Sequence, residues 1–195
     1  MPSFPAEIRA PAGSVAGVSG YQIKIGSSTV TTPGDYPDAL VAMNVAAYKQ
    51  NISDLKVGGI LLINEDGFDE KALKKVGLLS NPLDDETLHQ KYTVYSIPIT
   101  RLTRESLSDT GLSGREIDRC KNFFTLGILL WLYSRPYEGT VNWIQNHFGK
   151  KPRLADAAKV ALLAGHRFAE ATELFAACFK IGKAPLPAGE YTTIT

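Results

Sequence analysis

The stretch Gly58-Gly-Ile-Leu-Leu-Ile-Asn64 decides the fold, and two further apolar runs, over residues 38–44 and 92–99, support it. The runs over 38–44 and 58–64 do not alternate apolar with polar residues, so both faces of each strand must be covered. Each gap between the runs is long enough to hold a helix. The sequence therefore predicts an α/β fold of three layers, in which a mostly parallel sheet is flanked by helices.

The segments around these runs have weaker patterns. Residues 1–20 are expected to be irregular, because prolines and glycines interrupt them. Residues 21–25 alternate and predict a strand, with residues 29–32 as its return partner in a hairpin. Helices are predicted at 44–55 and 69–76, and a polar connection over 81–90 leads to the third strand.

The second half of the chain is predicted to be helical. Ser113-Gly-Arg-Glu116 has the form of a capping box and opens a helix that runs to residue 134. Two more helices are predicted at 138–148 and 153–179. Small residues recur at three- and four-residue steps in the last helix and permit close approach of a neighbouring helix; they include Ala158, Ala161 and Gly165. Residues 1–181 are interpreted as one domain, and 182–195 as a tail or interdomain linker.

Composition excludes several classes of protein. The net charge of +1 over 195 residues argues against a nucleic-acid or membrane surface. The longest apolar stretch, residues 123–133, is too short to span a bilayer. Cys120 and Cys178 form neither a C-x-x-C pair nor a zinc spacing, and reducing, cytoplasmic surroundings fit best. The first residues have no signal-peptide pattern.

Polar residues follow the predicted strands, where parallel sheets bind ligands and partners beyond the carboxyl ends of their strands. Asn44, Asn64 and Glu65 are therefore candidate contact residues. The alternative is that such residues only end strands and cap helices. No paired carboxylates, Cys-His pair or Ser-His-Asp set can be assembled, and the three histidines lack metal-ligand spacing. The sequence thus predicts no catalytic residue and no metal ligand.

Several segments resemble one family in order and spacing. They are Phe4–Arg9, Val18–Ile25, Asp38–Asn44, Gly58–Asn64, Lys121–Gly127 and Trp131–Pro136. Together they resemble the 2-oxoacid:ferredoxin oxidoreductases, specifically the gamma subunit or the gamma domain at the front of some alpha subunits. The resemblance extends over about residues 2–180 and is closest to fused chains that act on 2-oxoglutarate.

The resemblance implies a function that composition does not reveal. Such enzymes oxidatively decarboxylate a 2-oxoacid with thiamine diphosphate, form the acyl-CoA, and pass electrons through iron–sulfur clusters to ferredoxin. Clusters need cysteine ligands, which two distant cysteines cannot supply. The chain is therefore expected to be a non-catalytic component that binds none of these cofactors alone. Its implied partners are the alpha and beta domains or subunits, with ferredoxin reached through the complex.

The sequence departs from the family at its start. The family's gamma domain opens with a strand, a G-x-G-G-x-G turn and a helix ahead of Glu7-Ile-Arg9, and these do not precede Met1. We expect that the chain is a piece of a longer polypeptide or that another chain fills the gap. Residues 192–195 resemble the point where a fused chain continues into its alpha domain.

Two charged residues near the start are further candidates for partner contact. Glu7 and Arg9 are two residues apart on an extended segment and therefore point to the same side. The alternative is a surface ion pair that contributes about 0–1 kcal/mol. The alternative function is a free-standing α/β module that binds a small molecule or nucleotide through Asn44, Asn64 and Glu65.

Overall fold

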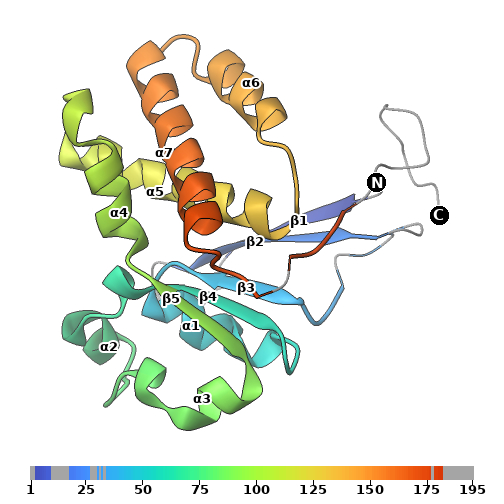
Figure 1. Cartoon of the computed structure of the whole chain (residues 1–195). Helices are drawn as coiled ribbons and strands as arrows, with labels where there is room; N and C mark the ends of the chain where they lie inside the picture. Colours follow the sequence, from blue (N-terminus) through green and yellow to red (C-terminus); the bar gives the residue numbers. More distant parts are fainter. Residues whose placement is uncertain are drawn as a thin grey trace. The chain divides into compact units, whose positions relative to one another are not determined.

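The chain forms two compact units in a computed structural model that describes residues 3–9, 18–26, 30, 32, 34–176 and 178–181 (Figure 1). Among the described residues, the first unit extends to Ile97 and the second begins at Pro98 and extends to Ile181. The interpretation of residues 1–181 as one domain stays a prediction. The predicted tail, residues 182–195, lies outside the described residues.

The first unit contains the predicted parallel sheet. Its strands are β3 (Ala39–Ala42), β4 (Ile60–Asn64) and β5 (Thr93–Ile97), and β4 lies in the middle. Both pairings are parallel: Leu61 lies opposite Leu40 on one side and Val94 on the other. The α/β fold, with a small parallel sheet flanked by helices and a helical second half, is confirmed.

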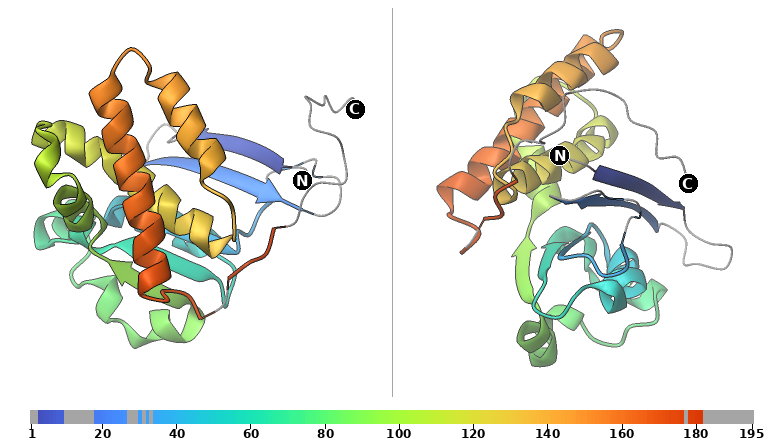
Figure 2. Two further views of the ribbon diagram at one scale, coloured as in Figure 1. Left: turned by 45° about the horizontal axis from the view of Figure 1, so that its top comes forward. Right: turned by 90° about the vertical axis from the view of Figure 1, so that its right-hand side faces the viewer.

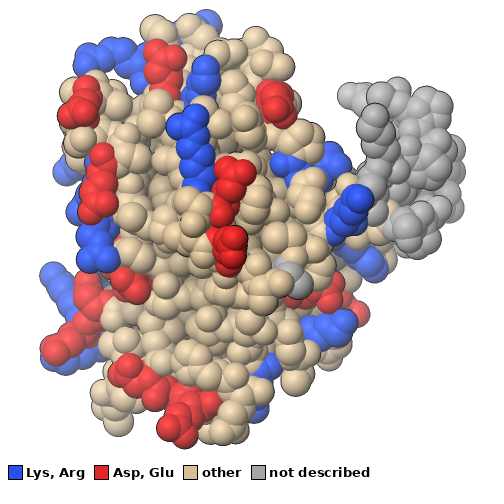
Figure 3. Space-filling view, viewed as in Figure 1, with Lys and Arg blue, Asp and Glu red and all other residues tan. Residues whose placement is uncertain are grey.

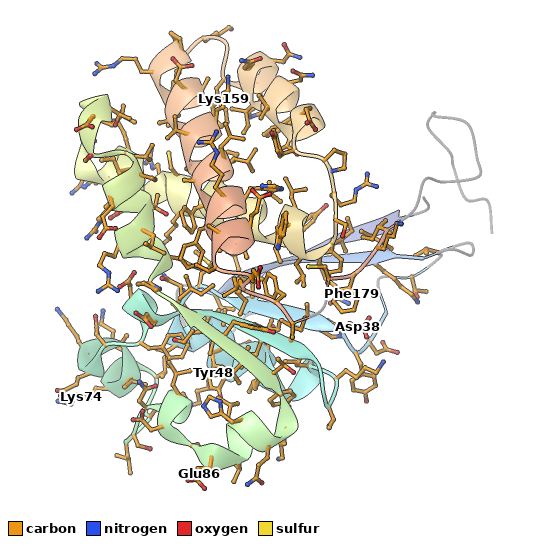
Figure 4. The ribbon with its side chains drawn as sticks, viewed as in Figure 1. Asp38, Tyr48, Lys74, Glu86, Lys159 and Phe179 are labelled. Carbon is orange, nitrogen blue, oxygen red and sulfur yellow. The ribbon has the colours of Figure 1, made fainter. Side chains whose placement is uncertain are left out.

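Burial of β4 explains why its sequence does not alternate. Leu61, Leu62, Ile63 and Asn64 are all buried, although successive side chains point to opposite faces of the sheet. Leu61 and Ile63 belong to a core that also contains Tyr48 and Leu73 from the helices that cover one face. Those helices are α1 (Val45–Asn51), α2 (Glu70–Lys75) and α3 (Glu86–Lys91), which lie on the same side of the sheet in Figures 1 and 2. Figure 4 labels Tyr48, whose ring packs edge-on against the ring of Phe68 with 5.8 Å between the ring centroids.

The beginning of the chain corrects one expectation. The prediction of irregular structure over residues 1–20 is wrong for β1 (Ser3–Arg9), which pairs antiparallel with β2 (Ser19–Ile25). Proline is tolerated here, because each strand of a two-stranded sheet has an open edge that needs no N–H donor. The predicted return strand is also wrong for residues 30 and 32, which are not in a strand; 29 and 31 lie outside the described residues.

Short helices and turns connect the strands. After α1 the chain continues through a 3-10 turn, η1 (Ile52–Asp54), which completes the predicted helix at 44–55. The polar connection over 81–90 contains η3 (Pro82–Asp84) and α3, neither of which was predicted. Helix α3 begins where the Asp85 carboxylate accepts a hydrogen bond from the Thr87 N–H at 2.9 Å. A helix of six residues is too short to show its period.

The second unit is helical. Its elements are α4 (Ile99–Ser106), η4 (Ser108–Thr110), α5 (Gly114–Leu132), α6 (Glu138–His147) and α7 (Pro152–Ala171). The predicted capping box is confirmed at the start of α5, where the Ser113 N–H donates to the Glu116 carboxylate at 2.9 Å. Helix α7 ends eight residues earlier than predicted, because Glu173 adopts a left-handed φ of 46° and the Leu174 N–H bonds the Ala169 carbonyl.

Helices α5 and α7 cross at two glycines. A Cβ atom on Gly165 would lie 1.9 Å from the Phe124 carbonyl oxygen, and one on Gly127 would lie 2.0 Å from the Leu162 carbonyl oxygen. The two backbones are therefore in direct contact, as the small residues of α7 predict. Figure 2 shows α6 beside α7, and Ile144 of α6 is buried against Ala158 and Leu162.

A paired Arg and Asp join α4 to α5 and give a pH-dependent prediction. Arg104 donates two hydrogen bonds to the Asp118 carboxylate, at 2.8 and 2.9 Å, and these bonds hold the pKa of that carboxyl below its ordinary value. The pair is partly exposed, so Asp118→Asn should reduce the free energy of unfolding at pH 7 by only about 0.5–1 kcal/mol. A lowered pKa stabilises the fold at pH values above the ordinary carboxyl value of about 4.

The difference between wild type and Asp118→Asn should therefore shrink as the pH falls below about 4. Urea unfolding of both proteins between neutral and acidic pH measures it. The matched control is Glu70→Gln, which removes an exposed pair with Lys74 at 3.7 Å (Figure 4 labels Lys74). A difference for Asp118→Asn that is independent of pH would contradict the assignment.

Candidate functional site

The carboxyl ends of β3, β4 and β5 lie at one edge of the parallel sheet, and the structure brings three predicted residues together there. Asn44 follows β3, Asn64 ends β4, and Glu65 begins η2 (Glu65–Gly67). Asp38 precedes β3 at the opposite edge, where its carboxylate pairs with Lys56 at 3.3 Å (Figure 4). We therefore describe the carboxyl edge as the candidate site.

Asn44 caps helix α1. Its backbone is extended, and its side-chain oxygen accepts a hydrogen bond from the Ala47 N–H at 2.8 Å. This bond satisfies one of the N–H groups that a helix leaves open at its first turn. The structure thus gives Asn44 the capping role that the sequence left open beside ligand contact.

Asn64 ties the ends of two strands together. It is 1% exposed, and its side-chain amide donates to the Met43 carbonyl, just after β3, at 3.2 Å. A buried amide needs such partners, because losing them leaves its desolvation uncompensated. Gly67 allows this close approach, since a Cβ atom there would lie 2.7 Å from the Met43 carbonyl oxygen and 2.9 Å from the Asn44 Cα.

Glu65 connects β4 to β5. Its carboxylate accepts a hydrogen bond from the Ser96 hydroxyl at 3.2 Å, 31 residues away in the chain. Sequence reasoning missed Ser96 and Gly67 as members of this edge. Ser96 stands one residue before the end of β5, so its place in the third apolar run was the signal available. Nothing in the local sequence around Gly67 indicates the close contact with Met43.

Glu7 and Arg9 lie elsewhere in the first unit. Both belong to β1, and the register places Glu7 opposite Tyr21 and Arg9 opposite Ser19. Their backbone is extended, as the sequence predicts. Strand β1 pairs only with β2 among the described strands, so Glu7 and Arg9 belong to a different sheet from Asn44, Asn64 and Glu65, and their role as contact residues stays a prediction.

The three histidines make local contacts, and of the two cysteines Cys120 is buried and Cys178 is exposed. A ring nitrogen of His89 lies 3.0 Å from the Leu83 carbonyl oxygen, His147 stacks on Trp143 at 4.5 Å, and the His166 ring meets those of two neighbouring aromatic residues. Burial raises the pKa of the Cys120 thiol, with a further contribution from Glu116. A thiol with a raised pKa is a poor nucleophile at neutral pH.

The carboxyl edge can hydrogen-bond a ligand or a neighbouring backbone. The described residues contain no group of three or more His, Cys, Asp or Glu side chains that could hold a metal ion. The predictions of no catalytic residue and no metal ligand stay predictions for the whole chain. Charges of both signs are interspersed on the face drawn in Figure 3. No helix in the described part combines the length and apolar character of a bilayer span.

The first unit thus has an α/β fold in which Asn64 and Glu65 link the ends of neighbouring parallel strands. The family model for pyruvate ferredoxin/flavodoxin oxidoreductase matches residues 1–168. The chain belongs to this family, and the resemblance drawn from its sequence is confirmed at that level.

One relative agrees with this membership by sequence, and a solved structure shares the fold. The chain is 44% identical, over all 195 residues, to the 2-oxoglutarate oxidoreductase subunit KorA of Mycobacterium tuberculosis, and it spans 30% of that relative's length. The fold is similar to 2-oxoglutarate:ferredoxin oxidoreductase from Magnetococcus marinus, solved with 2-oxoglutarate, coenzyme A and succinyl-CoA bound. That similarity has a TM-score of 0.66 and 22% identity, and covers 93% of this chain and 28% of the other. The gamma subunit of a keto/oxoacid ferredoxin oxidoreductase from Geobacter sulfurreducens is more distant, with a TM-score of 0.47, 16% identity, and coverage of 85% and 80%.

Proposed function

We propose that the chain is a non-catalytic, gamma-type component of a thiamine-diphosphate-dependent 2-oxoacid:ferredoxin oxidoreductase that acts on 2-oxoglutarate. The observation that carries the proposal is the 44% identity to a 2-oxoglutarate oxidoreductase subunit over the full 195 residues. Because the chain spans 30% of that relative, the remaining polypeptide would carry the reaction. The products would be the acyl-CoA, carbon dioxide and two electrons for ferredoxin.

The residues of this chain support a role without cofactor chemistry. An iron–sulfur cluster needs several cysteine thiolates, but Cys120 is buried within α5 and Cys178 is exposed beyond α7. Diphosphate groups bind proteins through Mg²⁺ that carboxylates hold, and the described residues contain no group of three or more His, Cys, Asp or Glu side chains that could hold a metal ion. We therefore assign the iron–sulfur clusters and thiamine diphosphate to the alpha and beta polypeptides, and we expect coenzyme A to bind in the assembled enzyme. Two free thiols fit a cytoplasmic location, and the small net charge fits an enzyme that binds neither nucleic acid nor membrane.

The candidate contact residues have different accessibility within this proposal. Asn64 is buried, so contact with a partner at the carboxyl edge falls to Asn44 and Glu65, which are partly buried. Glu7 and Arg9 remain the proposed contacts on β1. Replacing both with alanine should weaken assembly with the other polypeptides, and unchanged assembly would reject their role.

Copurification tests the proposal. A tagged chain, expressed together with the polypeptides that complete the enzyme, should retain bound thiamine diphosphate and iron, and the assembly should oxidise 2-oxoglutarate in preference to pyruvate. A chain that purifies alone, and whose loss leaves 2-oxoacid oxidation intact, would contradict it. Tight binding of coenzyme A or a nucleotide to such a solitary chain, measured by calorimetry, would instead assign the free-standing binding module.

A further inference from the structure

Strand β2 exposes a stripe of large apolar side chains. Tyr21, Ile23 and Ile25 occupy alternate positions, and their exposed fractions are 66%, 49% and 39%. Alternate residues of a strand point to the same face, so the three form one continuous surface, here named the β2 stripe. Single exposed apolar residues are common, but a contiguous row of three on one strand marks a surface that another structure covers.

The opposite face of β2 meets the chain's own backbone. The Gln22 side-chain amide donates to the Gly34 carbonyl at 2.8 Å. The Lys24 side chain lies over the same glycine, with its Cδ 3.3 Å from where a Cβ atom would stand. The usual arrangement of an amphipathic strand is therefore inverted in β2. Gln22 and Lys24 contact their own unit, whereas the apolar side chains on the other face are exposed to solvent.

The hairpin cannot cover this stripe by itself. Among the described strands, β1 alone pairs with β2, and a two-stranded ribbon is marginally stable without a layer packed on an apolar face. Isoleucine and tyrosine also bury their surface favourably, at about 25 cal/mol per Å² removed from water. A partner with an apolar surface would therefore gain binding free energy by covering the exposed side chains of Tyr21, Ile23 and Ile25.

We propose that the β2 stripe docks onto an apolar polypeptide surface of the rest of the oxidoreductase. This inference rests on the proposed function. In the relative that is 44% identical over the whole chain, the matched part is 30% of the polypeptide, so more than two thirds of it is available to pack on this domain. Glu7 and Arg9 belong to the same hairpin, opposite Tyr21 and Ser19. Tyrosine is enriched among the interface residues that contribute most to the free energy of binding.

The test replaces the stripe with residues that keep strand propensity. The triple variant Tyr21→Thr, Ile23→Thr, Ile25→Thr should weaken association with the completing polypeptides by on the order of 100-fold. The control variant Val57→Thr, Leu79→Thr removes two apolar residues that are more exposed and lie outside the stripe, and it should assemble as wild type does. Unfolding of both variants is measured first, and both are expected to fold.

Hydrogen exchange gives a second readout that needs no substitution. Backbone amides of residues 19–25 should exchange more slowly in the assembled enzyme than in the chain alone. Wild-type strength of assembly in the triple variant, or unchanged exchange in the wild-type assembly, would overturn the docking surface while leaving the proposed function standing. If the triple variant lost self-association but assembled as wild type does, the stripe would be a contact between two copies of this chain. That result would also overturn the proposed docking onto the rest of the oxidoreductase. A wild-type chain that never assembles would overturn the proposed function and the docking surface with it.

Discussion

Gly165→Ala should destabilise the chain by about 3 kcal/mol, although alanine is the better helix former by about 1 kcal/mol. The added Cβ would lie 1.9 Å from the Phe124 carbonyl oxygen and 2.7 Å from its carbonyl carbon. These are backbone atoms that no rotamer change can move, so α5 and α7 must separate and lose packing along their crossing. Urea unfolding of the wild type and the variant measures the difference. Gly127→Ala should behave in the same way, since its Cβ would lie 2.0 Å from the Leu162 carbonyl oxygen.

Gly139 provides the matched control for these glycines. It lies in α6, and a Cβ atom added there would meet nothing within 4 Å. Gly139→Ala should therefore stabilise the chain slightly, by up to about 1 kcal/mol. The changes in unfolding free energy are expected to have opposite signs at Gly139 and Gly165. Their comparison therefore separates the effect of helix propensity from the effect of the clash with the neighbouring backbone. A Gly165→Ala protein as stable as wild type would show that α5 and α7 do not cross in this way.

Ile63→Ala should cost about 3 kcal/mol, within the range of about 2–5 for emptying a buried site of this size. Ile63 is fully buried in the central strand β4 and belongs to the core with Tyr48 and Leu73. The destabilisation has two parts: the lost free energy of burying three side-chain carbon atoms, and the cavity that their removal leaves beneath the sheet. Thermal or urea unfolding measures it, and Leu79→Ala, at a fully exposed position, should change stability by less than about 0.5 kcal/mol. Equal small effects at both positions would contradict burial of β4.

The sequence predicted those features of the fold that depend on neighbouring residues. The unalternated run over 60–63 marked a strand buried on both faces, and Ser113 with Glu116 marked the start of α5. Features set by distant residues were missed. β1 depends on pairing with β2, and α4 begins directly after Pro98, inside the run predicted to be strand. Pro98 ends the strand there, and Ile99 is buried as the first residue of the helix.

For the candidate site, the positions of the residues could be predicted from the sequence, but their hydrogen-bond partners could not. Parallel strands deliver their carboxyl ends to one edge, so Asn44, Asn64 and Glu65 could be grouped from their positions alone. Their hydrogen-bond partners could not, since Asn64 bonds Met43 and Glu65 bonds Ser96 across 21 and 31 residues. The outward apolar face of β2 was equally hidden, because alternation reveals two faces of a strand but does not tell which one is covered.

We propose that this chain is a required, non-catalytic part of an enzyme that oxidises 2-oxoglutarate. The most direct measurement is the reduction of ferredoxin, dependent on 2-oxoglutarate and coenzyme A, by the enzyme assembled with and without the chain. We expect reduction only when the chain is present, with thiamine diphosphate and iron bound to the other polypeptides. Equal rates of ferredoxin reduction with and without the chain would contradict the account.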